Sequence, residues 1–212
     1  MSRPNGRGGR DVVLVPGLWM PSAVMRLLAA RLARSGYSAH VFAYRGRGSL
    51  DVNIERLRAF ARQSLEGRPG HFIGHSLGGV VIMEMLGRHP DVAAASVLLI
   101  GSPVRGCHAG RRLGLARIGR WMMGGSRPLW EEREARWGRP EPLGVIAGTQ
   151  PLGLGRALGR LPGPSDGVVR VAETAVEGMR DRALVPVGHS ALIVDRRVAQ
   201  LAERFMVQGR FG

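Results

Sequence analysis

Short apolar runs alternate with longer amphipathic stretches along most of this 212-residue chain. The runs are rich in β-branched residues and end at glycine or proline, which is typical of strands buried on both faces of a sheet. We expect strands at 11–15, 38–43, 71–74, 95–101, 143–148 and 170–177, and helices at 21–34, 53–65, 77–87 and 191–205. This alternation predicts an α/β fold, with a doubly wound, mainly parallel sheet of about six strands and flanking helices.

The length and composition favour one globular domain, since 44% of the residues are hydrophobic and 22% are charged. We expect a flexible Gly/Arg-rich tail at 1–10 and a single domain over 11–212. No apolar run reaches the roughly 18 residues of a membrane span, and the first ten residues lack the apolar stretch of a signal peptide. The expected location is therefore cytoplasmic.

The chain is strongly basic, with 31 basic residues against 16 acidic ones and a formal charge of +15. Every basic residue is arginine, and the abundance of glycine and alanine indicates codon bias as one source of this pattern. The arginines are spread along the chain and no RNA- or DNA-binding module is recognisable, so no specific nucleic-acid partner is expected. The charge is compatible instead with peripheral contact with an anionic membrane.

The decisive motif is Gly74-His75-Ser76-Leu77-Gly78, which matches G-x-S-x-G between an expected strand and an expected helix. A serine held in a strained turn at the end of a strand projects its hydroxyl above the sheet. The two glycines are needed because a β-carbon at either position would crowd the neighbouring strand and helix. The N-terminus of the following helix favours negative charge near the serine. The context predicts a nucleophilic serine rather than an ordinary Gly-rich turn.

A nucleophilic serine needs a base, and the six histidines are the candidates. His71 and His75 lie close to the serine in sequence, but the geometry of the strand and turn points them elsewhere. His189 lies in a loop between the last strand and the last helix. The chain order Ser, Asp, His is typical of this motif, which makes His189 the predicted base. The alternative is a histidine that caps a helix or sits exposed in a loop.

The base in turn needs an acid to orient it, and Asp166 is the leading candidate because it lies in a loop after the fifth strand. Asp181 and Asp195 are too close to His189 along the chain to approach it from another loop. Glu173 is a reserve candidate. The alternative for Asp166 is a turn residue, which is the commonest role of an Asp-Gly pair.

Two backbone N–H groups are needed to hold the oxyanion of a tetrahedral intermediate. One is expected from Leu77, directly after the serine, and the other from Leu18, in the turn that follows the first strand. The alternative for that turn is a plain strand-to-helix connection.

These motifs resemble those of small α/β-hydrolases of the lipase and esterase kind, and the chain is similar to compact bacterial triacylglycerol lipases that lack two N-terminal antiparallel strands. The resemblance covers most of the chain and rests on Val-Pro-Gly-Leu at 15–18, Gly-His-Ser-Leu-Gly-Gly at 74–79, Gly-Ser-Pro at 101–103, Ser-Asp-Gly-Val-Val at 165–169 and Gly-His-Ser at 188–190. It implies a minimal α/β-hydrolase fold with Ser76 as nucleophile, Asp166 as acid, His189 as base, and the amides of Leu18 and Leu77 in the oxyanion hole. The family usually has His-Gly where this chain has Pro16-Gly17.

The segment 104–142 interrupts the alternation of strands and helices. It holds nine arginines and three of the four tryptophans, and Leu115, Ile118 and Met122 recur in it at helical spacing. It is either a crossover helix with a solvated charged side, or a flap over the active site or a membrane-surface helix with basic flanks. A second segment, 149–166, is rich in Gly, Pro and Leu and is expected to be irregular.

The expected function is a serine ester hydrolase that cleaves carboxylic esters through an acyl-enzyme on Ser76. Trp19 and the Leu- and Trp-rich flap favour an apolar acyl or alcohol group, as in a lipid ester. A thioesterase or acyltransferase would use the same residues, and a catalytically idle scaffold that binds a partner is the remaining alternative. No metal or organic cofactor is expected, because this chemistry needs none and the chain has one cysteine and no Cys/His cluster at ligand spacing.

Overall fold

The computed structural model describes residues 9–44, 46–151 and 161–212. Six strands form one parallel sheet in the order β2-β1-β3-β4-β5-β6. They are β1 (Asp11–Val15), β2 (Ser38–Val41), β3 (Gly70–His75), β4 (Ala94–Ile100), β5 (Leu143–Gly148) and β6 (Asp181–Val185). The α-helices are α1 (Ser22–Arg34), α2 (Leu50–Leu65), α3 (Leu77–Arg88), α4 (His108–Leu115), α5 (Arg117–Met123) and α6 (Arg196–Gln208). The predicted doubly wound α/β fold is confirmed.

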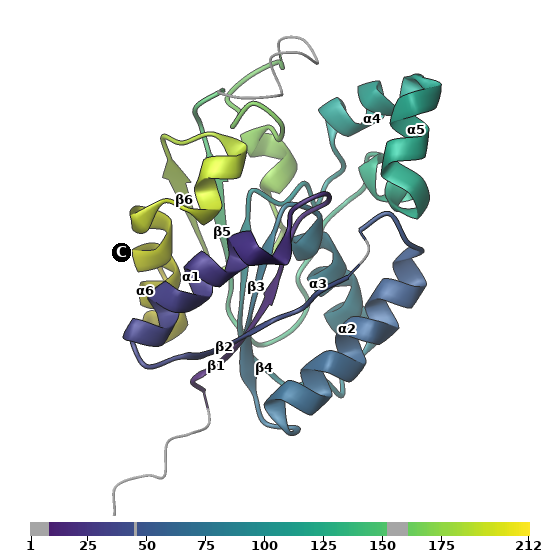
Figure 1. The fold of residues 1–212 in the computed structure, drawn as a ribbon. Coiled ribbons are helices and arrows are strands. Elements are labelled where there is room, and N and C mark those ends of the chain that lie inside the picture. The colour runs from purple at the N-terminus through teal and green to yellow at the C-terminus, as the bar shows by residue number, and fades with distance from the viewer. Residues whose placement is uncertain (1–8, 45, 152–160) are drawn as a thin grey trace, which may run out of the picture.

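The helices cover both faces of the sheet, with α1 and α6 on one side and α2 and α3 on the other (Figure 1). Along each inner strand, alternate side chains pack against the helices on opposite faces of the sheet. In β1, Val12 and Leu14 pack on the α1 and α6 side, whereas Val13 and Val15 pack on the α2 and α3 side. All four are fully buried, which is why this strand reads as a continuous apolar run.

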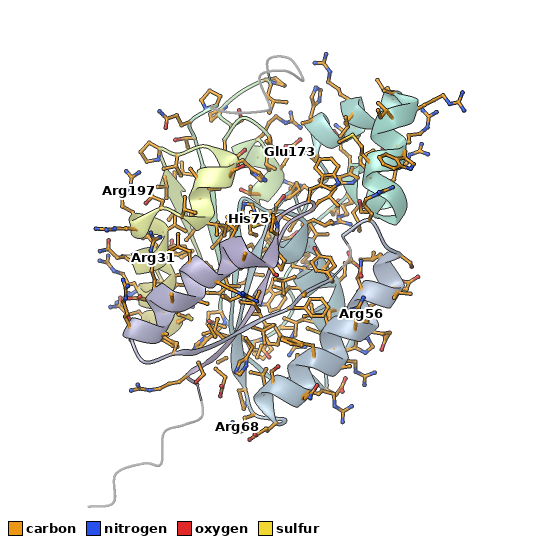
Figure 2. All side chains as sticks on the ribbon, in the orientation of Figure 1. Arg31, Arg56, Arg68, His75, Glu173 and Arg197 are labelled. Atoms are coloured by element: carbon orange, nitrogen blue, oxygen red, sulfur yellow. The ribbon has the colours of Figure 1, made fainter. Side chains whose placement is uncertain are left out.

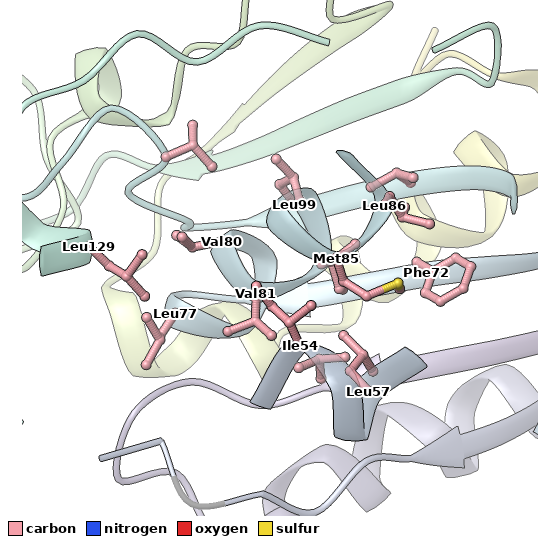
Figure 3. Close-up of a cluster of buried hydrophobic side chains, with 14 of the residues drawn as sticks. Ile54, Leu57, Phe72, Leu77, Val80, Val81, Met85, Leu86, Leu99 and Leu129 are labelled. Atoms are coloured by element: carbon pink, nitrogen blue, oxygen red, sulfur yellow. The ribbon is translucent and has the colours of Figure 1, made fainter. Parts of the chain in front are cut away.

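The layer beneath α2 and α3 is the larger core, and part of it is shown in Figure 3. In this cluster Phe72 of β3 and Leu99 of β4 lie against Met85 of α3. Ile54 of α2 belongs to the same cluster. The same cluster extends to Leu129, in the 3₁₀ segment η1 (Gly124–Trp130). Part of the predicted flap is therefore packed into the core.

The sixth strand is not where the sequence analysis placed it. Residues 170–177 contain the 3₁₀ turn η3 (Val171–Thr174), whereas the strand beside β5 is Asp181–Val185. The error has a physical reason: β6 is an edge strand with alternating burial, so it lacks the apolar run that marks the inner strands.

The last helix also begins later than expected. Residues 189–193 form the 3₁₀ segment η4 (His189–Ile193), and α6 begins at Arg196. The carboxylate of Asp195 accepts a hydrogen bond of 2.7 Å from the Arg197 N–H, which caps the helix at this point.

The predicted flap, 104–142, contains α4, α5 and η1, and the first two lie together beyond one end of the sheet, apart from both helix layers (Figure 1). The predicted tail and the predicted irregular segment fall partly on 1–8 and 152–160, which are outside the described residues. Within the described part of the chain, no helix is both long enough and apolar enough to cross a membrane.

Candidate active site

Ser76 occupies a sharp turn between the last residue of β3 and the first residue of α3, with φ 52° and ψ −124°. Its own N–H donates to the carbonyl of Ile100 at 2.9 Å, which ties the turn to the end of β4. A β-carbon on Gly74 would overlap the backbone of Gly79 in α3, and one on Gly78 would overlap the carbonyl oxygen of Val15 in β1. Both glycines are thus required by the close approach of the helix to the strands.

The three residues singled out as nucleophile, base and acid lie in one hydrogen-bonded row. The Ser76 Oγ is 3.1 Å from the His189 Nε2, and the His189 Nδ1 is 2.7 Å from the Asp166 Oδ2. They follow β3, β6 and β5 respectively, so they meet at the carboxyl ends of the parallel strands. This arrangement can pass a proton from the serine to the imidazole.

The Asp166 carboxylate is buried and its two oxygens have different partners. The Oδ1 accepts hydrogen bonds from the N–H groups of Val168 at 2.9 Å and Val169 at 2.7 Å, which leaves the Oδ2 to His189. The His189 N–H also donates to the Asp166 carbonyl at 3.0 Å. Asp166 therefore shapes its own turn, as the Asp-Gly pair indicated, and also orients the histidine.

Glu173, the reserve acid, has a different place (Figure 2). It is buried, and its carboxylate accepts a hydrogen bond of 2.6 Å from the N–H of His108, the first residue of α4. The same carboxylate pairs with the guanidinium of Arg170 at 2.9 Å. Glu173 thus anchors the start of the flap rather than the imidazole of His189.

His75 does not point away from this site, contrary to the sequence prediction. Its ring is buried at the centre of the molecule (Figure 2), with its centroid 4.8 Å from that of His189, and its Nε2 lies 3.2 Å from the His189 carbonyl oxygen. Burial, with a smaller contribution from His189, lowers the pKa of His75 to about 3. A neutral His75 can donate its Nε2 proton to that carbonyl and so hold the loop that carries His189.

The residues expected to form the oxyanion hole are neighbours. A β-carbon on Gly46 would lie 2.9 Å from the Leu18 side chain and 3.7 Å from that of Leu77. Leu77 is the first residue of α3, so its N–H has no acceptor within the helix. The turn that carries Leu18 is held by Tyr44, whose hydroxyl donates to the Pro16 carbonyl at 2.9 Å.

Ser76 opens into a cavity of about 630 Å³, a volume typical of small-molecule sites. Trp19, on the rim, donates its indole N–H to the Met122 carbonyl at 3.1 Å and so joins the turn after β1 to α5. The described walls are mainly apolar and come from that turn, from α1, from the flap and from the loops that carry Asp166 and His189: Leu18, Met20, Val24, Ala109, Leu113, Met123, Trp130, Val168 and Val187.

Cys107 also lines the cavity, which the sequence analysis did not foresee. Its sulfur accepts from the Gly110 N–H at 3.4 Å and caps α4. Burial, together with the negative charge of Glu173, raises the pKa of the Cys107 thiol to about 12, so it contributes a neutral wall. Among the described residues, no cluster of three or more His, Cys, Asp or Glu side chains could hold a metal ion.

A model of the alpha/beta hydrolase family matches residues 12–210. The chain belongs to the alpha/beta hydrolase family. No curated protein sequence matches this hydrolase. Among solved structures, it is similar to the mature form of the lipase BlEst2 from Bacillus licheniformis, with a TM-score of 0.77 and 16% identity over 96% of this chain and 93% of that one.

Two further structures resemble the hydrolase. A metagenomic carboxyl esterase has a TM-score of 0.67 and 20% identity over 88% of this chain and 66% of that one. The naproxen esterase of Bacillus subtilis has a TM-score of 0.57 and 16% identity over 96% and 85% of the two chains. At these identities the similarity establishes a shared fold.

Proposed function

We propose that this hydrolase is a serine carboxylic-ester hydrolase that acts through an acyl-enzyme on Ser76. One observation carries the proposal: the hydrogen-bonded row Ser76–His189–Asp166 ends at the floor of an apolar cavity. A buried carboxylate on one imidazole nitrogen leaves the other nitrogen free to accept the serine proton. The membership of the family and the fold shared with lipases and esterases agree with this chemistry.

In the first half of the reaction, the Ser76 Oγ attacks the carbonyl carbon of the ester while the His189 Nε2 takes the hydroxyl proton. The negative charge that develops on the carbonyl oxygen is held by the N–H groups of Leu18 and Leu77. Asp166 keeps the Nδ1 proton in place and stabilises the imidazolium. Collapse of the intermediate breaks the bond to the alcohol oxygen, which leaves with the proton from the Nε2.

In the second half, water replaces the alcohol. The His189 Nε2 removes a proton from the water as its oxygen attacks the acyl carbon, and the same two N–H groups hold the second oxyanion. Collapse returns the proton to the Ser76 Oγ and releases the carboxylic acid. No group beyond the side chains and backbone described is needed for the proton balance.

The cavity walls favour esters with an apolar acyl or alcohol group. Leucine, methionine, valine and tryptophan side chains surround Ser76, and the polar side chains of the described lining are few. Burial of an alkyl chain against such walls is favourable by about 0.8 kcal/mol per methylene. A short, charged ester would lose its hydration there without gaining a partner.

Labelling with a fluorophosphonate probe tests the nucleophile directly. We expect the wild-type protein to be labelled, Ser76→Ala to be unlabelled, and Ser190→Ala to be labelled like the wild type. Ser190 is a matched control because it is a second serine that borders the same cavity. A folded wild-type protein that resists the probe would refute the proposal and favour a binding scaffold.

The substrate class is tested separately with p-nitrophenyl esters from acetate to palmitate. The apolar cavity predicts that kcat/KM rises with chain length beyond acetate. Equal or higher kcat/KM on acetate than on all longer esters would contradict the assignment of an apolar pocket, while labelling of Ser76 would still support the nucleophile.

A further inference from the structure

The end of α4 and most of α5 expose large apolar side chains. Residues 112–121, here called the tip, carry Leu115, Ile118 and Trp121, which are 80%, 67% and 66% exposed. In an ordinary surface helix such residues would face the core. Here the contact between the two helices uses Gly119 instead, where a β-carbon would overlap the Leu113 carbonyl oxygen. The tight packing of the backbone leaves the apolar side chains outside.

The tip is also positively charged. The chain has six arginines and no acidic residue between Val92 and Trp130. Within the described residues, no ion pair joins Arg112, Arg117 or Arg120 to a carboxylate. Arg47 approaches from the loop before α2, where its guanidinium lies 4.2 Å from the Trp121 ring centroid. The exposed apolar side chains thus stand among guanidinium groups that have no anionic partner.

The tip borders the mouth of the cavity above Ser76. Leu113, two positions before Leu115, and Met123, two positions after Trp121, line the cavity wall. Trp19, also on the rim, donates its indole N–H to the Met122 carbonyl, directly after the tip. A surface that contacts the tip would therefore lie beside the entrance to the site.

We propose that the tip docks on a lipid bilayer that contains anionic lipids. Leu115, Ile118 and Trp121 would enter the boundary between headgroups and acyl chains, while Arg112 and Arg117 would contact lipid phosphates. The basic and apolar side chains of the tip are complementary to an anionic bilayer, which is negative at its surface and apolar beneath it. This complementarity favours such a bilayer as the partner. The consequence for catalysis, delivery of a lipid ester to the cavity mouth, rests on the proposed function, but the docking itself does not.

Vesicle co-sedimentation tests the docking, with Ser76→Ala as the background so that no lipid is consumed. We expect this protein to bind vesicles of phosphatidylcholine mixed with phosphatidylglycerol at least about tenfold more tightly than vesicles of phosphatidylcholine alone. R112Q/R117Q should weaken binding to the mixed vesicles by about tenfold or more, since each basic residue near the surface contributes about fivefold. R34Q/R56Q is the matched control, because it removes the same charge from exposed positions on α1 and α2.

The apolar contribution has its own pair of variants. L115S/I118S should lose most of the vesicle binding, whereas V52S/V207S, at exposed positions on α2 and α6, should bind like the background protein. Trp121 is a built-in reporter, so its emission should shift to the blue on mixed vesicles, and Trp121→Phe should remove that shift.

Equal losses in R112Q/R117Q and R34Q/R56Q would overturn the proposal in favour of general charge attraction. Equal binding to the two kinds of vesicle would overturn the role of anionic lipid. No binding to any vesicle would overturn it outright. Fluorophosphonate labelling of the wild-type protein distinguishes the two proposals. A protein that is labelled but does not bind vesicles would support the proposed function and refute the docking. A protein that binds vesicles but is not labelled would support the docking and refute the proposed function.

Discussion

Ser76 has a backbone conformation that a glycine adopts far more easily than any other residue, with φ 52° and ψ −124°. Such a conformation costs a residue with a β-carbon about 1–3 kcal/mol, and the surrounding contacts must offset this strain. The substitutions Ser76→Gly and Ser76→Ala test this strain. Both variants lack the hydroxyl that contacts His189, so their comparison isolates the effect of the backbone.

The expected difference follows from two opposing effects. Glycine at position 76 relieves the strain of about 1–3 kcal/mol, but its more flexible unfolded chain costs about 0.4–1 kcal/mol relative to alanine. Ser76 borders the cavity, so the alanine methyl group makes few contacts that glycine would lose. Ser76→Gly should therefore be more stable than Ser76→Ala by up to about 2.6 kcal/mol, with a midpoint of about 1.3 kcal/mol, which for a chain of 212 residues raises Tm by about 3 °C at the midpoint.

Urea denaturation followed by circular dichroism, with thermal scans of the same samples, measures this difference. Glu66 provides a control away from the site, because it ends α2 in the left-handed conformation with φ 51°. Glu66→Gly should likewise be more stable than Glu66→Ala, by about 1 kcal/mol at most. If Ser76→Gly proved less stable than Ser76→Ala while the Glu66 pair behaved as expected, the assignment of strain to the turn would be refuted.

Three further predictions concern buried polar groups. Asp166→Asn should lower kcat by about 10⁴-fold. The N–H groups of Val168 and Val169 would hold the oxygen of the new amide, so its NH₂ group would face the His189 Nδ1 and force the wrong imidazole tautomer. An ester assay with activity within about tenfold of wild type would contradict this. Burial lowers the pKa of His75 to about 3 from the usual 6.5, so between these pH values the residue takes up a proton when the chain unfolds. The free energy of unfolding should therefore fall on acidification through this range by up to about 1.4 kcal/mol per pH unit. Urea titrations at several pH values should show a smaller slope for His75→Gln, and an unchanged slope would rule out this source. Glu173→Ala should lower the free energy of unfolding by about 1–3 kcal/mol and expose the start of α4 to proteolysis, because the His108 N–H loses its acceptor. A protease time course like that of wild type would contradict the role of Glu173 in holding α4.

The inner part of the fold could be predicted from sequence because its signals are local. The strand 11–15 is apolar on both faces and stops at Pro16-Gly17, and the turn at Ser76 needs glycines that the motif displays. The edge strand β6 could not be found in the same way, because alternate side chains of Asp181–Val185 face solvent and its pairing with β5 decides its conformation.

The chain order, together with the positions of Asp166 and His189 in loops that follow expected strands, predicted three residues that the structure places in hydrogen-bond contact. Sequence reasoning does not find the contact between His75 and His189, because it depends on how the loop after β6 packs against the turn at Ser76. Cys107 was missed for a similar reason: packing across the flap, rather than any pattern around the residue, turns its thiol toward the cavity.

The hydrogen-bonded row of Ser76, His189 and Asp166 also reports how far folding has proceeded. Ser76 and His189 are 113 positions apart, and each lies beyond a different strand of the sheet. A folding intermediate that has assembled β1, β3 and β4 would hold the serine in its turn yet would lack both of its partners. In a refolding experiment, labelling of Ser76 by an electrophilic probe should therefore return only with the final docking of β5 and β6, later than the helical signal.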